Sequence, residues 1–447
     1  MRETETLYDP NTALANAFAT LQPNTPPLPT MSLRLFTPLI ALALTSCAPA
    51  VHQQAMDPAL PERIGDGGNI ERRDTNDRAP QVEPPAGQVC RDDPRVHACI
   101  VHRVPGDRSA LALATGHGSL ALAYIPLMNS PRGPEATAGA TLILHDRELR
   151  PIGESRLVAK GALRDISLIG TPDGWMAALA IDNRIEIVRL DIEGREYGYR
   201  STIADASLPR LSADPPRPPL LAWSRPSDGS FAARVIVDIG SPPRPTTIFN
   251  STTEPQFGGQ IAIAPGEFLL ARRSSDGVVI RQLSAKGELG SRHADVGADT
   301  EYPTLVRCDD GPRLIWSEFG GRGEVRWARL RDDGEVIGEM IRLSGIPTHF
   351  NHSPAVCDGT ETLVLLSGYT GGTGLSKSLD LVRVDNTGEI ISDLLPLHGD
   401  SGRMAHRPTM LRDHDALFIA WATWNQPVRV ALARVDLEST GGPAIAR

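Results

Sequence analysis

The sequence predicts an all-β protein, a β-propeller of four-stranded blades with about seven blades, six and eight being the alternatives. Three observations predict this fold class: a repeated segment, an apolar run inside each copy, and a turn-rich hairpin late in each copy. A single four-stranded sheet cannot cover both of its own faces, so such copies are stabilised by stacking around a ring. A β-sandwich would instead show repeats of about 100 residues.

Prolines mark the start of most copies of the repeat. Five copies open with a proline, and these prolines are 46, 48, 51 and 54 residues apart: Pro209, Pro255, Pro303, Pro354 and Pro408. Two weaker copies begin near Ala110 and Leu163, which brings the number of starts to seven. This spacing is typical of propeller blades, which need about 40–50 residues each.

Each copy contains a short, continuous apolar run that predicts its second strand. Examples are LLAW at 220–223, LVLL at 363–366 and FIAW at 418–421. Runs of this length between turn residues are typical of strands buried on both faces. The third strand then ends in an Asp/Gly-rich turn, such as DIEG at 191–194 or DNTG at 385–388, which predicts a hairpin to a fourth strand.

The last copy, which starts at Pro408, is one strand short. A strand-like segment without a blade of its own, Ala98–Val104, lies just before the first copy. We therefore predict that Ala98–Val104 forms the outer strand of the last blade and closes the ring.

Four cysteines lie in the repeat region: Cys90, Cys99, Cys308 and Cys357. Three disulfide pairings of four cysteines exist, and four free thiols are the alternative. We favour Cys90 with Cys99, which closes a short loop, and Cys308 with Cys357, which occupy similar positions late in the first strands of adjacent copies. No C-x-x-C or Cys/His spacing predicts a zinc site.

A targeting signal precedes the repeats. The segment MSLRLFTPLIALALTSCAPA, Met31–Ala50, has one positive charge at Arg34 and an apolar stretch over Leu35–Leu44. That stretch is too short for a bilayer core, which needs about 20 residues. Leu44, Thr45, Ser46 and Cys47 follow one another in the order aliphatic, small, small, cysteine.

This pattern resembles the lipobox of bacterial lipoproteins, and the whole chain resembles lipobox-type lipoproteins with β-propeller repeats and no assigned role. The resemblance implies that Cys47 receives the lipid, including palmitate, and becomes the N-terminus after cleavage. It also implies a protein anchored to the lipid bilayer of the bacterial cell envelope, at the outer membrane, either periplasmic or surface-exposed. The alternatives are ordinary secretory cleavage after Ala50 and a chance apolar segment in a cytosolic protein.

These features divide the chain into four parts. Residues 1–30 are polar and proline-rich and are interpreted as a misassigned upstream start, and residues 31–46 as the signal peptide. Residues 47–87 lack apolar periodicity and predict a disordered tether. Residues 88–447 form the predicted propeller domain.

Composition and motifs exclude several functions. The net charge of −9 and the lack of a basic run argue against nucleic acid as a partner. The chain has no G-x-S-x-G, H-E-x-x-H or P-loop motif, so no cofactor, no metal and no catalytic residue is predicted. SSDGVVI, Ser274–Ile280, resembles an Asp-box turn of sialidases but occurs once, and a plain hairpin turn is the favoured interpretation.

Alternating strand directions would bring the residues before the blade prolines to one mouth of the central channel. The loops between second and third strands share that face, and together they give six candidate ligand-binding residues: Glu301, His349, His352, Tyr369, His406 and Trp424. Aromatic and ionisable side chains suit ligand binding, whereas solvated loop residues are the alternative. The loops of the later copies are the richer ones, so a site is expected over the fifth to seventh blades.

Three classes of function fit this sequence. The favoured one is a non-catalytic binding or scaffold module that recognises a protein or glycan. The second is a hydrolase or lyase acting on envelope or extracellular glycans or esters at the propeller mouth. The third is a structural subunit of an envelope assembly complex. The fold alone does not choose among them.

Overall fold

The computed structural model describes 17 segments of the repeat region, and all statements below concern these. They are residues 93–104, 108–130, 133–136, 139–212, 218–227, 230–236, 246–249, 260–264, 267–274, 277–296, 300–318, 324–343, 353–370, 376–392, 395–397, 405–423 and 428–437. The predicted upstream start, signal peptide, Cys47 and tether lie outside the described residues. Cys90, Pro255, His349, His352 and Trp424 also lie outside them.

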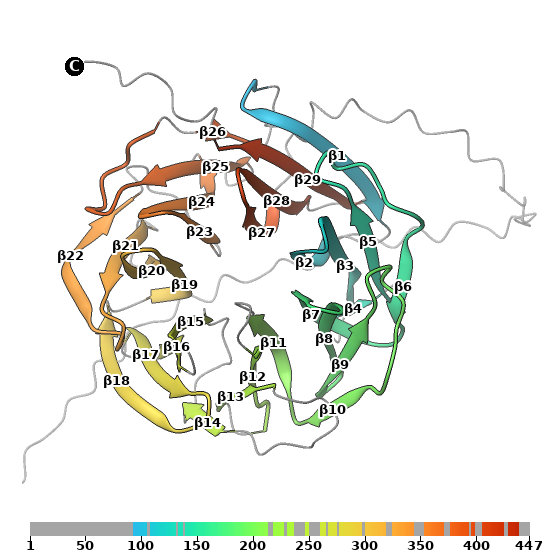
Figure 1. Cartoon of the computed structure of the whole chain (residues 1–447), viewed down its shortest axis with the longest axis horizontal. Coiled ribbons are helices and arrows are strands. Elements are labelled where there is room, and N and C mark those ends of the chain that lie inside the picture. Colours follow the sequence, from blue (N-terminus) through green and yellow to red (C-terminus); the bar gives the residue numbers. More distant parts are fainter. Residues whose placement is uncertain are drawn as a thin grey trace, which may run out of the picture. The chain divides into compact units, whose positions relative to one another are not determined.

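The described strands form seven antiparallel sheets arranged as the blades of a ring (Figure 1). Blade 1 contains β2 (Arg108–Gly116), β3 (Ser119–Ser130), β5 (Ala140–His145) and β6 (Arg156–Ala159), with β4 (Gly133–Ala136) paired to β3. Blade 2 contains β7 (Leu163–Thr171), β8 (Gly174–Ile181), β9 (Arg184–Leu190) and β10 (Ser201–Ala204). Blade 3 contains β11 (Ser207–Ser212), β12 (Leu220–Ser224), β13 (Phe231–Val235) and β14 (Thr246–Phe249).

The remaining four blades follow in chain order. Blade 4 contains β15 (Gln260–Ala264), β16 (Glu267–Ser274), β17 (Gly277–Ser284) and β18 (Leu289–Val296). Blade 5 contains β19 (Thr300–Cys308), β20 (Gly311–Glu318), β21 (Glu324–Leu330) and β22 (Val336–Arg342). Blade 6 contains β23 (Ala355–Asp358), β24 (Glu361–Thr370), β25 (Ser376–Val384) and β26 (Leu395–Pro396). Blade 7 contains β27 (Ala405–Asp413), β28 (Ala416–Thr423), β29 (Val428–Asp436) and β1 (Val96–Val104).

The strand from the N-terminal side closes the ring, as predicted. β1 pairs antiparallel with β29, from Val96 opposite Val435 to Val104 opposite Val428, and becomes the outer strand of blade 7 (Figure 1). The strand begins at Val96, two residues before the predicted start. The predicted fold class and the count of seven blades are confirmed, and β4, an added strand in blade 1, is the feature that the repeat pattern did not predict.

The cores lie between neighbouring blades. The second strands are buried on both faces, and every residue of β8 and β28 is buried, as their continuous apolar runs predict. Five tryptophans are fully buried in these cores: Trp175, Trp223, Trp316, Trp327 and Trp421. Burial of each large apolar side chain stabilises the fold by about 1.5–3 kcal/mol, so the ring is stabilised mainly at the contacts between blades.

A tight turn recurs between the third and fourth strands. In four blades a glycine occupies its left-handed position, with φ from 76° to 97°: Gly194, Gly287, Gly334 and Gly388. Its N–H donates to the carbonyl three residues earlier. In blade 1 the same position is taken by Leu149, with φ 62°, and its N–H donates to the Asp146 carbonyl at 3.0 Å. Leu149 is buried in the core between blades 7 and 1, so an apolar side chain is present there despite the strained backbone.

A disulfide joins Cys308 at the end of β19 to Cys357 in β23, with the two Cα atoms 5.1 Å apart. It links the first strands of blades 5 and 6, and this predicted pairing is confirmed. Cys99 is also disulfide-bonded. Its predicted pairing with Cys90 stays a prediction, because Cys90 lies outside the described residues.

Candidate functional site

Three of the six predicted ligand-binding residues fall on described strands. Glu301 lies opposite Ser317 near the start of β19, and His406 lies opposite Ala422 near the start of β27. Tyr369 lies opposite Lys377 near the end of β24. These positions share one end of blades 5, 6 and 7, which we call the mouth face. The structure does not describe these three side chains, so their role in binding stays a prediction.

The first strands begin at the mouth face with a break in their pairing. In β11 the register shifts between Ser207 and Arg210, and in β19 it shifts between Glu301 and Thr304. The residue before the blade proline has a left-handed backbone in both, with φ 51° at Leu208 and 50° at Tyr302. Such bulges re-aim side chains, and a left-handed residue with a side chain costs about 1–2 kcal/mol. Pro209 and Pro303 thus follow strained residues, which the spacing of the repeat did not predict.

Blade 1 also contributes a projection to the mouth face, and sequence reasoning missed it. β3 continues beyond its pairing with β5, and its last residues pair with β4, from Leu127 opposite Ala136 to Ser130 opposite Gly133. β3, the second strand of blade 1, is the longest described strand, at 12 residues. The unusually long link between the apolar runs LALAY and TLILH was the available signal. Blade 1 lies next to blade 7 in the ring, so the extension formed by β3 and β4 continues the mouth face from blade 7 to blade 1 (Figure 1).

The described carboxylates on the mouth face of blade 5 are held by arginines. Glu318 Oε2 lies 3.1 Å from Arg326 Nε, and Glu318 Oε1 accepts a hydrogen bond of 3.4 Å from Trp316 Nε1. Glu324 bridges two arginines, at 3.0 Å from Arg326 Nη2 and 3.1 Å from Arg342 Nη1. Because arginines fix the orientation of these carboxylates, the groups suit recognition of a polar ligand.

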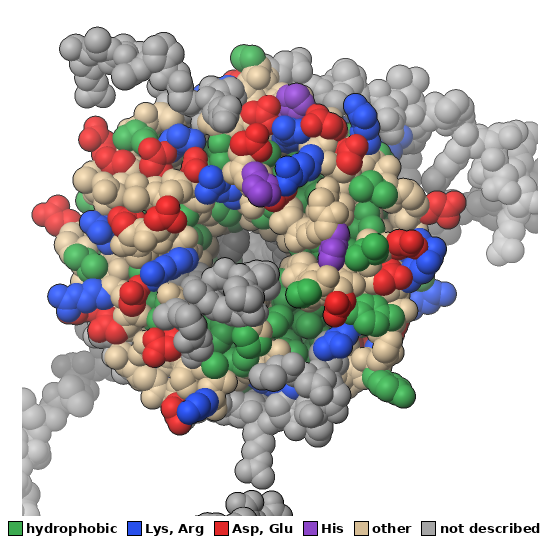
Figure 2. Space-filling view, viewed as in Figure 1, with side chains coloured by type: hydrophobic (Ala, Val, Ile, Leu, Met, Phe, Trp, Pro, Cys, Tyr) green, Lys and Arg blue, Asp and Glu red, His purple; other side chains and the backbone are tan. Residues whose placement is uncertain are grey.

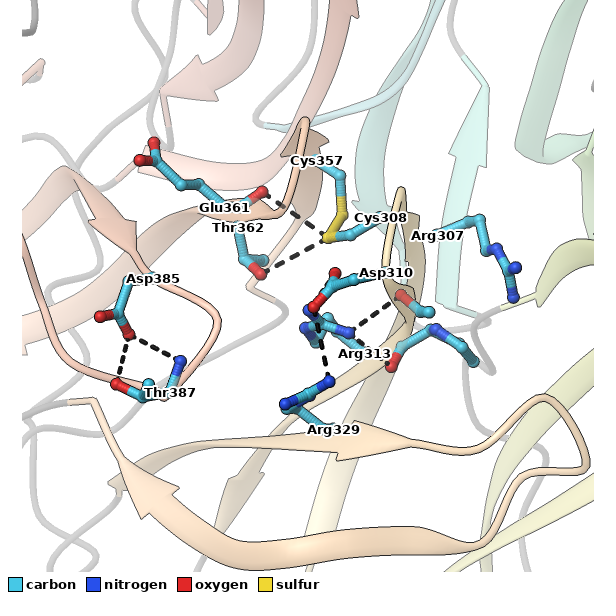
Figure 3. Close-up of polar contacts among 12 residues, drawn as sticks. Arg307, Cys308, Asp310, Arg313, Arg329, Cys357, Glu361, Thr362, Asp385 and Thr387 are labelled. Atoms are coloured by element: carbon cyan, nitrogen blue, oxygen red, sulfur yellow. Dashed lines mark hydrogen bonds and ion pairs between the residues drawn. A yellow bond between two sulfur atoms is a disulfide. The ribbon is translucent and has the colours of Figure 1, made fainter.

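The opposite end of the blades carries a second set of ion pairs, and acidic and basic side chains are interspersed on the surface seen in Figure 2. In blade 5, Arg313 is fully buried, and its Nη2 is paired with Asp310 Oδ1 (Figure 3). Arg329 Nη2 lies 3.5 Å from the other oxygen of Asp310. The Arg313 guanidinium also stands 5.6 Å from the centre of the Trp327 ring. Burial lowers the pKa of Arg313, while the Asp310 carboxylate favours its charge.

A second network of ion pairs at this end joins blades 6 and 7. Asp358 receives both Arg383 Nη2 at 3.2 Å and Arg412 Nη2 at 2.7 Å, so one carboxylate links two blades. Glu361 holds the other end of Arg383 at 3.1 Å. Partly exposed pairs of this kind contribute little stability each, about 0–1 kcal/mol, but a network fixes the orientation of its side chains. This end of the ring is therefore a rigid surface with mixed charge.

The described ranges contain neither a cluster of metal ligands nor a membrane-spanning helix. Within these ranges, no three His, Cys, Asp or Glu side chains converge as ligands for a metal ion. The described ranges also contain no helix with the length and apolar character to cross a membrane.

Comparisons with known proteins found similar structures but no similar sequence. No family model matches the chain, and no curated protein matches it. The β-propeller domain of Cps50 (Swd1) from Myceliophteria thermophila aligns with a TM-score of 0.48 and 12% identity, over 74% of this chain and 99% of that one. The Dos1 propeller aligns with a TM-score of 0.45 and 10% identity, over 74% of this chain and 93% of that one.

The NanB sialidase of Streptococcus pneumoniae aligns with a TM-score of 0.43 and 9% identity, over 79% of this chain and 70% of that one. Similarity at this level carries no information on activity or partners. The strand pairing of this chain itself identifies the fold, and the chain is a seven-bladed β-propeller.

Proposed function

We propose that this protein is a membrane-anchored envelope lipoprotein whose propeller is a non-catalytic binding or scaffold module for a protein or glycan. The observation that supports this role is the pairing of acidic side chains at both ends of blade 5. Asp310, Glu318 and Glu324 are all held by arginines, which suits polar recognition by preorganised groups. The proposed ligand site is the mouth face of blades 5–7, with Glu301, His349, His352, Tyr369, His406 and Trp424.

The anchor rests on Leu44–Cys47 and can be tested directly. Cys47→Ser removes the thiol that would take the lipid, so palmitate incorporation should be lost and the protein should leave the membrane fraction. The N-terminal residue of the mature wild-type protein is determined by mass spectrometry. A variant that stays with the membrane, together with a wild-type protein that begins at Val51, would contradict the lipid anchor.

The binding role is tested by an unbiased pull-down of the lipidated protein from its own membranes after mild cross-linking. The expected result is a specific partner whose capture is reduced at least tenfold in the triple variant H352A/H406A/W424A. Tyr199→Ala is the control, because Tyr199 is 91% exposed in blade 2, away from the proposed site. A folded triple variant that captures the partner as well as the wild type would place the site elsewhere.

A further inference from the structure

Two histidines meet inside the seam where the ring closes. His102 lies on β1, the closing strand, and His145 is the last residue of β5 in blade 1. Their ring centroids are 5.4 Å apart, and the ring planes are tilted by 55°. Since β1 belongs to blade 7, this contact joins the first and last blades across the 7–1 seam. We call His102 and His145 the histidine pair.

The histidine pair lies in an apolar layer. Ala98, Ile100 and Val104 share the His102 side of β1 and pack in the core between blades 7 and 1. His145 is completely buried. Neither ring nitrogen of His145 has a hydrogen-bond partner, and neither does Nε2 of His102. His102 is partly buried. The site accommodates two neutral rings, whereas a charged His145 ring would have neither solvent nor a hydrogen-bonded counter-ion in contact with it.

The charged and titratable groups around the pair lie mostly at one end of the seam. They are His97 on β1, Arg434 and Asp436 on β29, Asp413 at the end of β27, Tyr124 on β3, and Asp146, Arg147, Glu148 and Arg150 in the turn after β5. The side chains of β2 and β28 in this core are apolar. Several of these charged groups already pair with one another. Arg434 is paired with Glu148 and Asp436, and Arg147 lies 2.9 Å from Asp413.

We propose that the histidine pair is an acid-sensitive switch: its protonation separates the second half of β1 from blade 1 and opens the ring at the 7–1 seam. Protonation of both rings would bring two cations together in an apolar core. Hydration of the fully buried His145 ring requires β1 to move away, because the His102 ring on β1 packs against it. β1 is an outer strand that pairs on one side only, with β29, so it is the least constrained element of the seam.

The two ends of β1 are held in place by different contacts. His97, near its start, has Nε2 at 2.9 Å from Glu148 Oε2 and Nδ1 at 3.3 Å from Asp436 Oδ2. These contacts tie the start of β1 to the turn after β5 and to β29, while a proton on His102 weakens the middle of the strand. The expected motion is a fraying of residues 100–104, with the start of β1 still attached.

The pH range follows from burial. Burial lowers the pKa of His102, and burial together with the neighbouring His102 lowers the pKa of His145 to about 4. Asp146 opposes this shift only weakly. An exposed histidine has a pKa near 6.5, so between pH 6.5 and 4 the open seam binds a proton that the closed seam does not, and acid favours opening. If only His145 takes up a proton, the equilibrium constant for opening the 7–1 seam should rise about 20-fold between pH 7 and pH 5.

The carboxylates respond at a lower pH. His97 and Arg434 hold the pKa of Glu148 below its usual value of 4.5. The stabilisation from Glu148 is therefore present at pH 5 and above and is lost only as the pH falls through its lowered pKa. Measurements between pH 7 and pH 5 thus report on the histidine pair.

The test is amide hydrogen exchange of the full-length protein in detergent at pH 7, 6 and 5, corrected for the intrinsic rate at each pH. Protection of residues 100–104 should fall about 20-fold by pH 5, relative to β17 in blade 4. The double variant H102L/H145L should keep its protection, and His414→Asn, which removes an exposed histidine, should behave as the wild type. An equal loss in H102L/H145L and wild type, or no loss in the wild type, would overturn the proposal.

A second measurement needs no variant. Histidine ring signals recorded by NMR in the folded wild-type protein give the pKa of each ring. The proposal predicts that His145 titrates below pH 5 and that His102 titrates below its usual range. If both rings titrate near pH 6.5, the proposal is wrong, whether or not H102L/H145L folds.

Discussion

Two seams of the ring are built by different means. Between blades 5 and 6, the Cys308–Cys357 disulfide joins the first strands, and Trp327 Nε1 donates to Thr362 Oγ1 at 3.2 Å. Between blades 7 and 1, the described contacts are apolar packing, ion pairs and the histidine pair. The covalent link thus lies between blades that are already consecutive in the chain. In the part of the chain that the structure describes, the contacts between blades 7 and 1 are ones that can form and break reversibly.

The recurring turn shows the same contrast. At the 5–6 seam Gly388 lets the turn of blade 6 approach blade 5, because a Cβ there would lie 2.5 Å from Ile341 Cγ1. At the 7–1 seam Leu149 occupies the equivalent position and fills the core with its side chain. The 5–6 seam is thus held by close backbone approach at Gly388, and the 7–1 seam by the buried side chain of Leu149. Three predictions test whether the two seams differ in this way.

The largest effect is expected from removing the closing strand. Deleting residues 88–105 uncovers the edge of β29 and the apolar cores on both sides of blade 7, and should cost on the order of 5 kcal/mol or more. The cooperative thermal transition should be lost or shifted strongly downward in calorimetry. Deleting residues 48–80 is the control and should leave the melting temperature nearly unchanged. Equal melting temperatures for the two deletions would show that the ring closes without β1.

Removing the disulfide should weaken the molecule less. The bridge spans a sequence separation of 49, for which the chain-entropy model gives about 4 kcal/mol. Denaturant unfolding of C308A/C357A measures this loss. The double variant is preferable to a reductant because Cys99 is also disulfide-bonded. Hydrogen exchange at residues 100–104 should stay as in the wild type at pH 7, and a large increase there would contradict the independence of the two seams.

The smallest effect is expected from replacing Leu149, the buried turn residue at the 7–1 seam. Leu149→Ala empties a buried site and should cost about 3 kcal/mol in chemical denaturation. Leu149→Gly loses the same packing but relieves the left-handed backbone, which is worth about 1 kcal/mol, so it should be the more stable of the two variants. If alanine proves more stable than glycine at this position, the assignment of backbone strain to Leu149 is wrong.

Much of the fold was predictable because a propeller repeats its signal. The prolines, the apolar runs and the turns recur in register, so seven weak patterns support one another, and the missing strand of the last copy identified Ala98–Val104. The pairing of Cys308 with Cys357 followed from equivalent positions in two copies. These predictions needed only the order of strands along the chain.

The seam contacts were not predictable, since they depend on which face of a strand a side chain occupies. His102 in VHRV and His145 in LILHD carry no motif, and only the pairing of β1 with β29 brings them together. Leu149 looked like an ordinary turn residue because glycine marks that turn in other blades. For the candidate ligand site, strand order placed Glu301, Tyr369 and His406 at one end of three blades, but it does not specify the side-chain geometry.

The pairing of β1 with β29 also has a consequence for how the protein is made. Val96 lies opposite Val435, so β1 is synthesised long before its partner β29 and can be paired only after blades 1 to 6 have been made. Contacts of such long sequence separation form slowly, and an unpaired strand edge is prone to aggregate in the meantime. A chain that is cut short after blade 6 has no partner for β1 and cannot form a closed ring. Ring closure therefore depends on β29, because β1 stays unpaired until that strand has been made.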